Sequence, residues 1–262
     1  MTMKKLHLAF VVLLAMQPVF SFCTVEASSP DAPKDAVALS LDLLHTAQKA
    51  GDPAETQKEL AAYTVDELQA QLPDDAHKLA FWINVYNATV VLALQKAPDL
   101  YKDRGAFFSK DQVNVAGHEL SLDDIEHGML RHSRIKLSHG YLGNPFPGKF
   151  ERTFRVKDID FRIHFALNCG AKSCPPVAFY DTEHIDKELQ NSMDIYLRKY
   201  VKYDEKAGTV GVPAFMGWFR GDFGGKKGIL KLMHAQGLVP KDKKPDVEFN
   251  TYDWTMDITN FR

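Results

Sequence analysis

Helical periodicity dominates the pattern of hydrophobic and polar positions in the first part of the chain. Apolar side chains recur at near-helical spacing over 36–49, and a second short helix is expected at 66–71, before Pro73. The segment 75–95 is apolar on nearly every side, with Trp82, Tyr86 and Val90 among its residues. A helix of this kind is buried all round, so we expect it to run through the core.

Shorter elements follow, with turn signals between them. A hairpin at 113–120 should turn at Gly117, and Ser121 with Asp124 forms a capping box that starts a helix. The further expected elements are that helix at 122–131, a strand at 161–167, an amphipathic helix at 182–199, a strand–turn–strand at 201–212, a helix at 229–236 and a strand-like segment at 252–260. Helices followed by strands predict a single α+β domain over 36–262, with the central helix packed on a mainly antiparallel sheet.

The N-terminus has the pattern of a cleaved secretory signal. A basic start precedes an apolar run at 8–22, and Val25-Glu26-Ala27 supplies small residues before a cleavage site. We therefore expect a signal peptide at 1–27 and a flexible leader at 28–35. The protein is then exported, and periplasmic or secreted.

Other attachments to a membrane fit the sequence less well. Lipoprotein processing at Cys23 is disfavoured by the bulky Phe22 that precedes it. The apolar run at 79–94 carries Asn84 and Asn87 and is followed by Pro98. We therefore expect no integral membrane segment in the mature chain.

The charge balance excludes two classes of partner, and the cysteines allow a disulfide. The 262-residue chain has 32 Lys and Arg against 34 Asp and Glu, and loss of the signal peptide leaves 30 against 33. Nucleic acid or an anionic membrane would require a basic face, so we expect neither as a partner. Cys169 and Cys174 remain after cleavage and could pair as a disulfide in an oxidising compartment.

The segment 164–176 (HFALNCGAKSCPP) concentrates reactive groups. His164, Asn168 and two thiols stand at the end of the strand-like run, and Gly170 and Pro175 then break it. A rigid element that delivers polar groups to a glycine-containing loop holds them firmly and leaves them reachable. We expect any reactive centre of the protein to lie here.

Several blocks occur along the chain in a familiar order. They are FWINVYNA at 81–88, LSLDDIEHGMLR at 120–131, HFALNCGAKSCP at 164–175 and YDW at 252–254, with an aromatic block of Phe215, Trp218, Phe219, Asp222 and Phe223. In these blocks the chain resembles the DUF547 family, a domain of unknown function, as an exported bacterial-type member. The resemblance covers roughly 36–260 and implies a domain without implying an activity.

Polar side chains on two predicted helices are further candidates. Asn84 and Asn87 share one face of the central helix and either clamp the backbone of the Cys169 loop or line a site. Glu126 lies at the margin of an apolar stripe, beside His127 and Arg131. A carboxylate there could orient a histidine or pair with an arginine, and a solvated helix face is the alternative interpretation.

A thiol and a histidine together are the minimum for a thiolate nucleophile. The imidazolium stabilises the thiolate and later returns the proton. In an extended chain His164 and Cys169 would stand about 16 Å apart, so the loop must fold back for contact. His118, His127 or His139 is the partner if it does not.

These features predict cysteine-dependent acyl chemistry, as an amidase, peptidase or acyl-transferase on a peptide-like or envelope substrate. Cys169 is the expected nucleophile, His164 the acid and base, and Glu126 the orienting carboxylate, with N–H groups of 170–172 binding the oxyanion. The expected binding residues are Asn84, Asn87, His127, Arg131, Asn168, Ser173, Cys174 and Trp218. A central helix followed later by a histidine strand is also loosely similar to the papain and transglutaminase arrangement.

The competing hypothesis is a non-catalytic envelope binding module. In it a Cys169–Cys174 disulfide pins a loop, and the asparagines, Glu126 and aromatic residues build a ligand groove. Zinc at the two cysteines, which form a Cys-x4-Cys pair, is disfavoured because a second ligand pair is missing from the sequence. We therefore expect no metal and no cofactor. The sequence gives no basis for predicting an oligomeric state.

Overall fold

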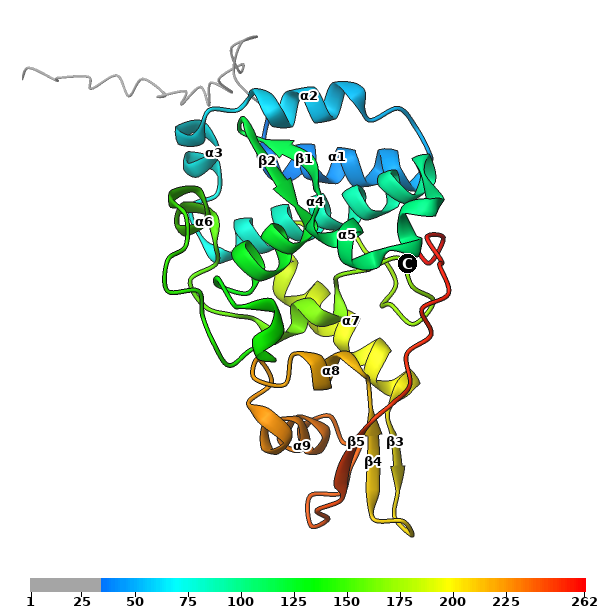
Figure 1. The fold of residues 1–262 in the computed structure, drawn as a ribbon. Helices are drawn as coiled ribbons and strands as arrows, with labels where there is room; N and C mark the ends of the chain where they lie inside the picture. The colour runs from blue at the N-terminus through cyan, green and yellow to red at the C-terminus, as the bar shows by residue number, and fades with distance from the viewer. Residues whose placement is uncertain (1–33) are drawn as a thin grey trace, which may run out of the picture. The chain divides into compact units, whose positions relative to one another are not determined.

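Helix α4 (Asp75–Lys96) runs through the hydrophobic core, as its all-round apolar sequence predicts (Figure 1). The structure is a computed structural model and describes residues 34–262. The predicted signal peptide at 1–27 lies outside the described residues, as does the leader except for Lys34 and Asp35. Trp82, Tyr86 and Val90 are all buried, which confirms the central helix.

The N-terminal helices pack beside α4. Helix α1 (Ala36–Gln48) lies along it and contributes Leu39, Leu43 and Leu44 to the core. Helices α2 (Ala54–Ala62) and α3 (Val65–Gln71) follow, and α3 begins at a capping box between Thr64 and Glu67. The sequence pattern did not predict α2, because only Leu60 of that helix is buried and its apolar periodicity is weak.

Short elements lead from α4 to the reactive segment. They are η1 (Pro98–Lys102), α5 (Arg104–Ser109), β1 (Asp111–Val115), β2 (His118–Ser121), the π-helix η2 (Asp124–Leu130), η3 (Lys136–Ser138), α6 (Lys149–Phe154) and η4 (Phe161–Phe165). The predicted hairpin is the antiparallel pair β1–β2. Ala116 and Gly117 form its turn with φ of 51° and 74°, which a two-residue hairpin turn requires.

The C-terminal part is built on helix α7 (Ile185–Tyr200), which the sequence predicted. It comprises β3 (Lys202–Asp204), β4 (Thr209–Val212), α8 (Phe215–Trp218), α9 (Gly225–Ala235) and β5 (Asp246–Phe249). Strands β3 and β4 pair antiparallel, and β5 joins β4 in parallel. Residues 34–262 therefore form an α+β fold with one antiparallel and one mixed sheet, and α4 packs chiefly against helices rather than against either sheet. No helix in residues 34–262 is long and apolar enough to cross a membrane.

The predicted strand at 161–167 is wrong, because this segment contains the 3₁₀-helix η4. The Asp160 carboxylate accepts a hydrogen bond from the N–H of Arg162, and Ile163 C=O accepts from Ala166 and Leu167, which closes a tight helical turn. Arg162 and His164 both lie within this helix. Their alternation with apolar neighbours resembles a strand in the sequence.

The predicted strand at 252–260 is also wrong. The C-terminal segment runs back from β5 (red in Figure 1) and pairs with the Cys169 loop and the chain after it at single bridges, Ala171 with Met256 and Val177 with Phe261. Its sequence carries Asp253 and Asp257, whose carboxylates accept hydrogen bonds from nearby N–H groups and so favour turns. This tail nevertheless brings aromatic side chains to the candidate site.

Two hydrophobic clusters make up the interior of the part of the chain that the structure describes. The larger surrounds α4, and the smaller lies among α7, α8, α9, β4 and β5. Helix α7 contributes Leu189 to the first cluster and Met193 and Leu197 to the second. The candidate site lies where members of both clusters meet.

Candidate functional site

A cavity of about 430 Å³ brings together side chains that are far apart in the sequence. The π-helix η2 supplies Glu126 and His127, and η4 supplies His164. The loop after η4 supplies Cys169. Of the predicted site residues, these four and Trp218 line the cavity.

Glu126 is a carboxyl group whose side chain is 14% exposed, and its one hydrogen-bond partner among residues 34–262 is the Tyr86 hydroxyl, 3.2 Å from its Oε2. Burial raises the pKa of Glu126 to about 7, with a further upward contribution from Asp123 and an opposing one from Arg131. Near neutral pH the group is therefore often protonated. In that form it offers a hydroxyl donor as well as an acceptor to the cavity.

His127 is held as one neutral tautomer. The Arg131 Nη1, which can only donate, lies 2.8 Å from its Nδ1, so Nδ1 is the acceptor and the proton sits on Nε2. Burial and the positive charge of Arg131 keep the pKa of His127 well below its usual value. The Nε2–H group faces Asp123 at 3.6 Å.

A buried carboxylate that the sequence analysis missed, Asp222, joins two predicted site residues. Its Oδ2 accepts hydrogen bonds from the Nε of Arg131 at 2.6 Å and from the Nε2 of His164 at 2.9 Å. Although burial alone would raise it, hydrogen bonds from His164 and Arg131 hold the pKa of Asp222 below its usual value. Burial lowers the pKa of His164, and the hydrogen bond to Asp222 opposes that shift.

Phe219 covers this network. The His164 ring stacks on it at a centroid distance of 4.3 Å and an interplanar angle of 8°, and the Arg131 guanidinium lies 4.4 Å from the same centroid. The sequence signal for Asp222 was its place in the aromatic block beside Phe223. The expectation that Glu126 orients His164 is wrong in this structure, because Asp222 occupies that position and Glu126 binds Tyr86 instead.

Cys169 and Cys174 form a disulfide. Cys169 lines the cavity, and Cys174 is buried behind it. As a disulfide the Cys169 sulfur is no free nucleophile, so the expected thiol chemistry requires prior reduction.

The predicted oxyanion site at 170–172 is wrong for this state of the loop. The N–H of Gly170 donates to Asn168 Oδ1, that of Ala171 to Cys174 Sγ, and that of Lys172 to the carbonyl of Thr255. All three donors are therefore already engaged. The loop and the tail at Thr255 thus satisfy these three backbone groups between them.

The predicted asparagines act as backbone clamps. Asn87 accepts from the N–H of Asn168 and donates to the carbonyl of Ala166, and Asn84 makes the same pair of bonds with Tyr180. Asn168 in turn donates to Pro175 C=O. All three amides are buried, which supports the clamp interpretation over the lining interpretation.

Ser173 holds the C-terminal tail, since its hydroxyl accepts from the N–H of Asp253. That contact fixes the start of an aromatic wall. Trp218 and Trp254 stack at 5.4 Å with an interplanar angle of 15°, and Tyr252 packs against both. Together these three rings form one side of the cavity.

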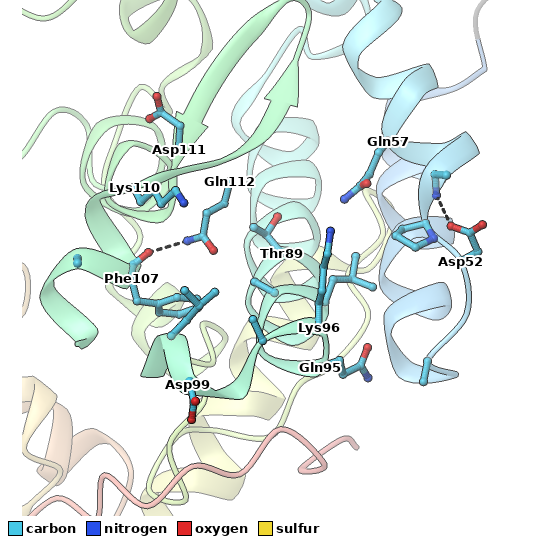
Figure 2. Close-up of a pocket in the computed structure, with 18 of the residues that line it drawn as sticks. Asp52, Gln57, Thr89, Gln95, Lys96, Asp99, Phe107, Lys110, Asp111 and Gln112 are labelled. Carbon is cyan, nitrogen blue, oxygen red and sulfur yellow. Dashed lines mark hydrogen bonds between the residues drawn. The ribbon is translucent and has the colours of Figure 1, made fainter. Parts of the chain in front are cut away.

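A larger hollow of about 1330 Å³ lies elsewhere on the molecule, between the end of α4, the start of α2 and the α5–β1 junction (Figure 2). Its polar groups are scattered, and some are engaged with their own neighbours, such as Gln112 with the carbonyl of Phe107. Buried acid–base groups gather instead at the smaller cavity, which is therefore the candidate site. Among residues 34–262 no group of three or more His, Cys, Asp or Glu side chains is arranged to hold a metal ion.

Comparison with known families identifies part of the chain. Residues 69–197 match the family model described as "Protein of unknown function, DUF547". This segment belongs to the DUF547 family. No curated protein and no solved structure matches the chain, so the papain and transglutaminase likeness stays a prediction.

The DUF547 match divides the cavity into two parts. Glu126, His127, His164 and Cys169 lie inside the matched segment. The aromatic side, with Phe215, Trp218, Phe219, Tyr252 and Trp254, comes from residues beyond it, as does the Asp222 carboxylate that binds His164. The DUF547 segment thus supplies the acid–base groups, and the C-terminal part supplies most of the aromatic surface.

Proposed function

We propose that the cavity binds a peptide-like or cell-envelope ligand through an amide group. The observation that carries this proposal is that Glu126 and His127, which carry little charge, stand beside aromatic walls, while the two charged side chains of the lining, Asp123 and Lys136, pair with each other at 2.7 Å. Glu126 near its pKa of about 7 and neutral His127 offer donors and acceptors with little charge. An amide presents one donor and one acceptor without a charge, and an apolar side chain next to it would pack on the Trp218–Trp254 surface.

Tryptophan fluorescence tests this proposal on the oxidised protein. Trp82 is fully buried in the core, whereas Trp218 and Trp254 line the cavity, so a bound ligand changes the emission of the latter two. N-acetyl-leucinamide and muramyl dipeptide are suitable probes. We expect saturable changes that Trp218→Phe and Trp254→Phe diminish, and about tenfold weaker binding of the charged acid N-acetyl-leucine. A linear response without saturation would reject the binding site.

The pH dependence isolates the role of Glu126. Binding of N-acetyl-leucinamide should weaken as the pH rises through about 7, where Glu126 loses its proton. Glu126→Gln keeps an uncharged donor and acceptor, so its binding should not change over this range. Glu55→Gln, at a side chain that is 74% exposed, is the matched control and should keep the wild-type profile.

The second candidate function is cysteine-dependent acyl chemistry on the bound amide. It is favoured by His164, fixed by Asp222, which lines the same cavity as Cys169. After reduction, the Cys169 sulfur would attack the amide carbonyl, the C–N bond would break, and His164 would pass the thiol proton to the leaving amine. Water would then hydrolyse the thioester.

Alkylation of the reduced protein tests that chemistry. Iodoacetamide should modify Cys169 near neutral pH, and His164→Gln should slow the reaction at least about tenfold if the imidazole assists the thiolate. His184→Gln, at an exposed histidine, serves as the control. A rate that is independent of His164 would contradict the acyl chemistry, and ligand binding would be the one proposed function that stands.

Export of the protein belongs to the same proposal. The basic start, the apolar run and Val25-Glu26-Ala27 support cleavage after Ala27, which would deliver the cavity to envelope ligands. The intact mass of the exported protein should then correspond to a chain that begins at Ser28. A lipid-modified Cys23 would contradict this.

A further inference from the structure

The Cys169–Cys174 disulfide is asymmetric in its surroundings. Cys169 lines the cavity and is partly accessible, whereas Cys174 has only 1% of its surface exposed. A reagent that enters the cavity therefore meets the sulfur of Cys169. Attack at that atom would make Cys174 the leaving group.

Hydrogen-bond donors converge on the buried sulfur. The backbone N–H groups of Cys169 and Ala171 lie 3.0 and 3.3 Å from Cys174 Sγ, and the Tyr252 hydroxyl lies 3.1 Å from it. The same hydroxyl lies 3.2 Å from Cys169 Sγ. A disulfide sulfur accepts hydrogen bonds weakly and a thiolate accepts them strongly, so these donors stabilise Cys174 more after the bond opens than before.

Hydrogen bonds also hold the loop that carries these donors. The loop is also held by Asn87, which bonds to the backbone on either side of Leu167, and by Lys172, which donates to the tail at Thr255. Asn168 adds bonds to Gly170 and Pro175. A disulfide that closes so short a loop adds little stability to a segment that these hydrogen bonds already hold. Stabilisation of the loop therefore does not explain why donors surround Cys174 Sγ.

We propose that Cys169–Cys174 is a thiol–disulfide exchange site for a dithiol that enters the cavity. One thiolate of the dithiol attacks Cys169 Sγ, the Cys169–Cys174 bond breaks, and Cys174 leaves as a thiolate bound by the two N–H groups and Tyr252. The second thiol of the partner then attacks the mixed disulfide and releases Cys169, which takes up a proton. Two electrons pass to the protein, and the dithiol becomes a disulfide.

This inference goes beyond the proposed ligand binding and stands independently of it. Ligand binding is measured on the oxidised protein by tryptophan emission. Exchange is measured by the state of the cysteines. Failure of one experiment therefore leaves the other result intact.

The equilibrium with reduced and oxidised dithiothreitol gives the first test. The mature protein is equilibrated without denaturant, trapped with iodoacetamide and weighed by mass spectrometry. We expect reduction under native conditions, and Tyr252→Phe should shift the equilibrium about tenfold toward the disulfide, because one donor to the Cys174 thiolate is lost. Tyr203→Phe, on β3, is the control and should not shift it. A disulfide that opens only in denaturant, or an unshifted Tyr252→Phe, would overturn the proposal.

Single-cysteine variants test which sulfur is attacked. Cys174→Ser leaves Cys169 facing the cavity, and Cys169→Ser leaves the buried Cys174. With Ellman's reagent, 5,5′-dithiobis(2-nitrobenzoic acid), we expect the Cys169 thiol to react at least about a hundredfold faster than the Cys174 thiol. Equal rates in folded variants, checked by circular dichroism, would remove the asymmetry on which the mechanism depends.

Discussion

At the residue scale, one carboxylate determines the state of its neighbours. Asp222 binds Arg131 and His164, and Arg131 in turn fixes the tautomer of His127. Arg131 and Asp222 are both fully buried at their side chains, so each depends on the other for a counter-charge. Glu126 is the exception, because no lysine or arginine in residues 34–262 forms an ion pair with it, and burial raises its pKa so that it holds its proton.

Replacing Asp222 should show how much this network matters to folding. Asp222→Asn leaves the Arg131 charge buried without a partner, and we expect the free energy of unfolding to fall by about 3–5 kcal/mol in urea titrations. Asp186→Asn removes an ion pair with Arg162 at a side chain that is 86% exposed, and should change it by less than about 1 kcal/mol. Similar effects of the two substitutions would contradict the network.

Glu126 should make the stability of the protein depend on pH. Its pKa rises from 4.5 to about 7 on folding, so the folded state binds the proton more tightly. The resulting stability is present below about 4.5 and is lost as the pH rises through about 7. Glu126→Gln does not titrate, and between pH 5 and pH 8 it should gain up to about 3 kcal/mol relative to the wild type. Parallel urea titrations at the two pH values measure this, and an unchanged difference would place the Glu126 pKa near its ordinary value.

At the element scale, the sequence predicts elements that bury an apolar stripe or end at a strong local signal. Helix α4, helix α1, the hairpin at Gly117 and the Ser121–Asp124 capping box were all predicted for these reasons. The wide turn of the π-helix η2 was not predicted. Its hydrogen bond from Arg131 N–H to Glu126 C=O does not change the spacing of apolar residues detectably in so short a segment.

The sequence did not predict which residues of the site contact one another. His164, Cys169, Glu126 and Trp218 were named from their blocks and do line one cavity. Asp222 lies 58 residues beyond His164, and its place in the aromatic block does not indicate that its carboxylate reaches that histidine. Likewise, the N–H groups of 170–172 looked free because their partners, Asn168 Oδ1, Cys174 Sγ and the carbonyl of Thr255, are set by the folded loop.

The clamp on the Cys169 loop gives a prediction at this scale. Asn87→Ala leaves a buried N–H at Asn168 and a buried carbonyl at Ala166 without their bonds, which should cost about 2–4 kcal/mol of stability and increase the rate at which dithiothreitol reduces the disulfide. Asn84→Ala breaks the equivalent clamp on Tyr180 and should destabilise the fold without changing that rate. If both variants increase the rate of disulfide reduction equally, Asn87 does not stabilise the Cys169 loop specifically.

At the scale of the whole molecule, the two hydrophobic clusters depend on each other. Helix α7 contributes to both, and Tyr252 in the tail packs against both. The cavity lies between residues of the first cluster, such as Tyr86 and Leu167, and residues of the second, such as Phe215. The DUF547 segment alone therefore does not contain a complete cavity.

Shortening the chain tests this dependence. A chain that ends at Tyr200 keeps residues 69–197 but loses Phe215, Asp222 and Tyr252. We expect no cooperative urea transition, because the face of α7 formed by Met193 and Leu197 becomes exposed and Arg131 loses its counter-charge. A chain that begins at Lys34 keeps the whole described unit and should retain the transition. A normal transition in the first chain would show that the DUF547 segment folds by itself.

The division of the cavity also bears on how such proteins can diverge. Reactive groups tolerate few substitutions, whereas an aromatic surface can be reshaped by exchanging rings of different size. Here most of the aromatic surface lies after Tyr200, so its rings can change while the groups around Glu126 and Cys169 stay intact, provided that Asp222, which binds His164, is kept. Two relatives that share the stretch around Glu126 and Cys169 and keep Asp222 and Tyr252, but differ in their other rings after Tyr200, could then select different ligands with the same reactive groups.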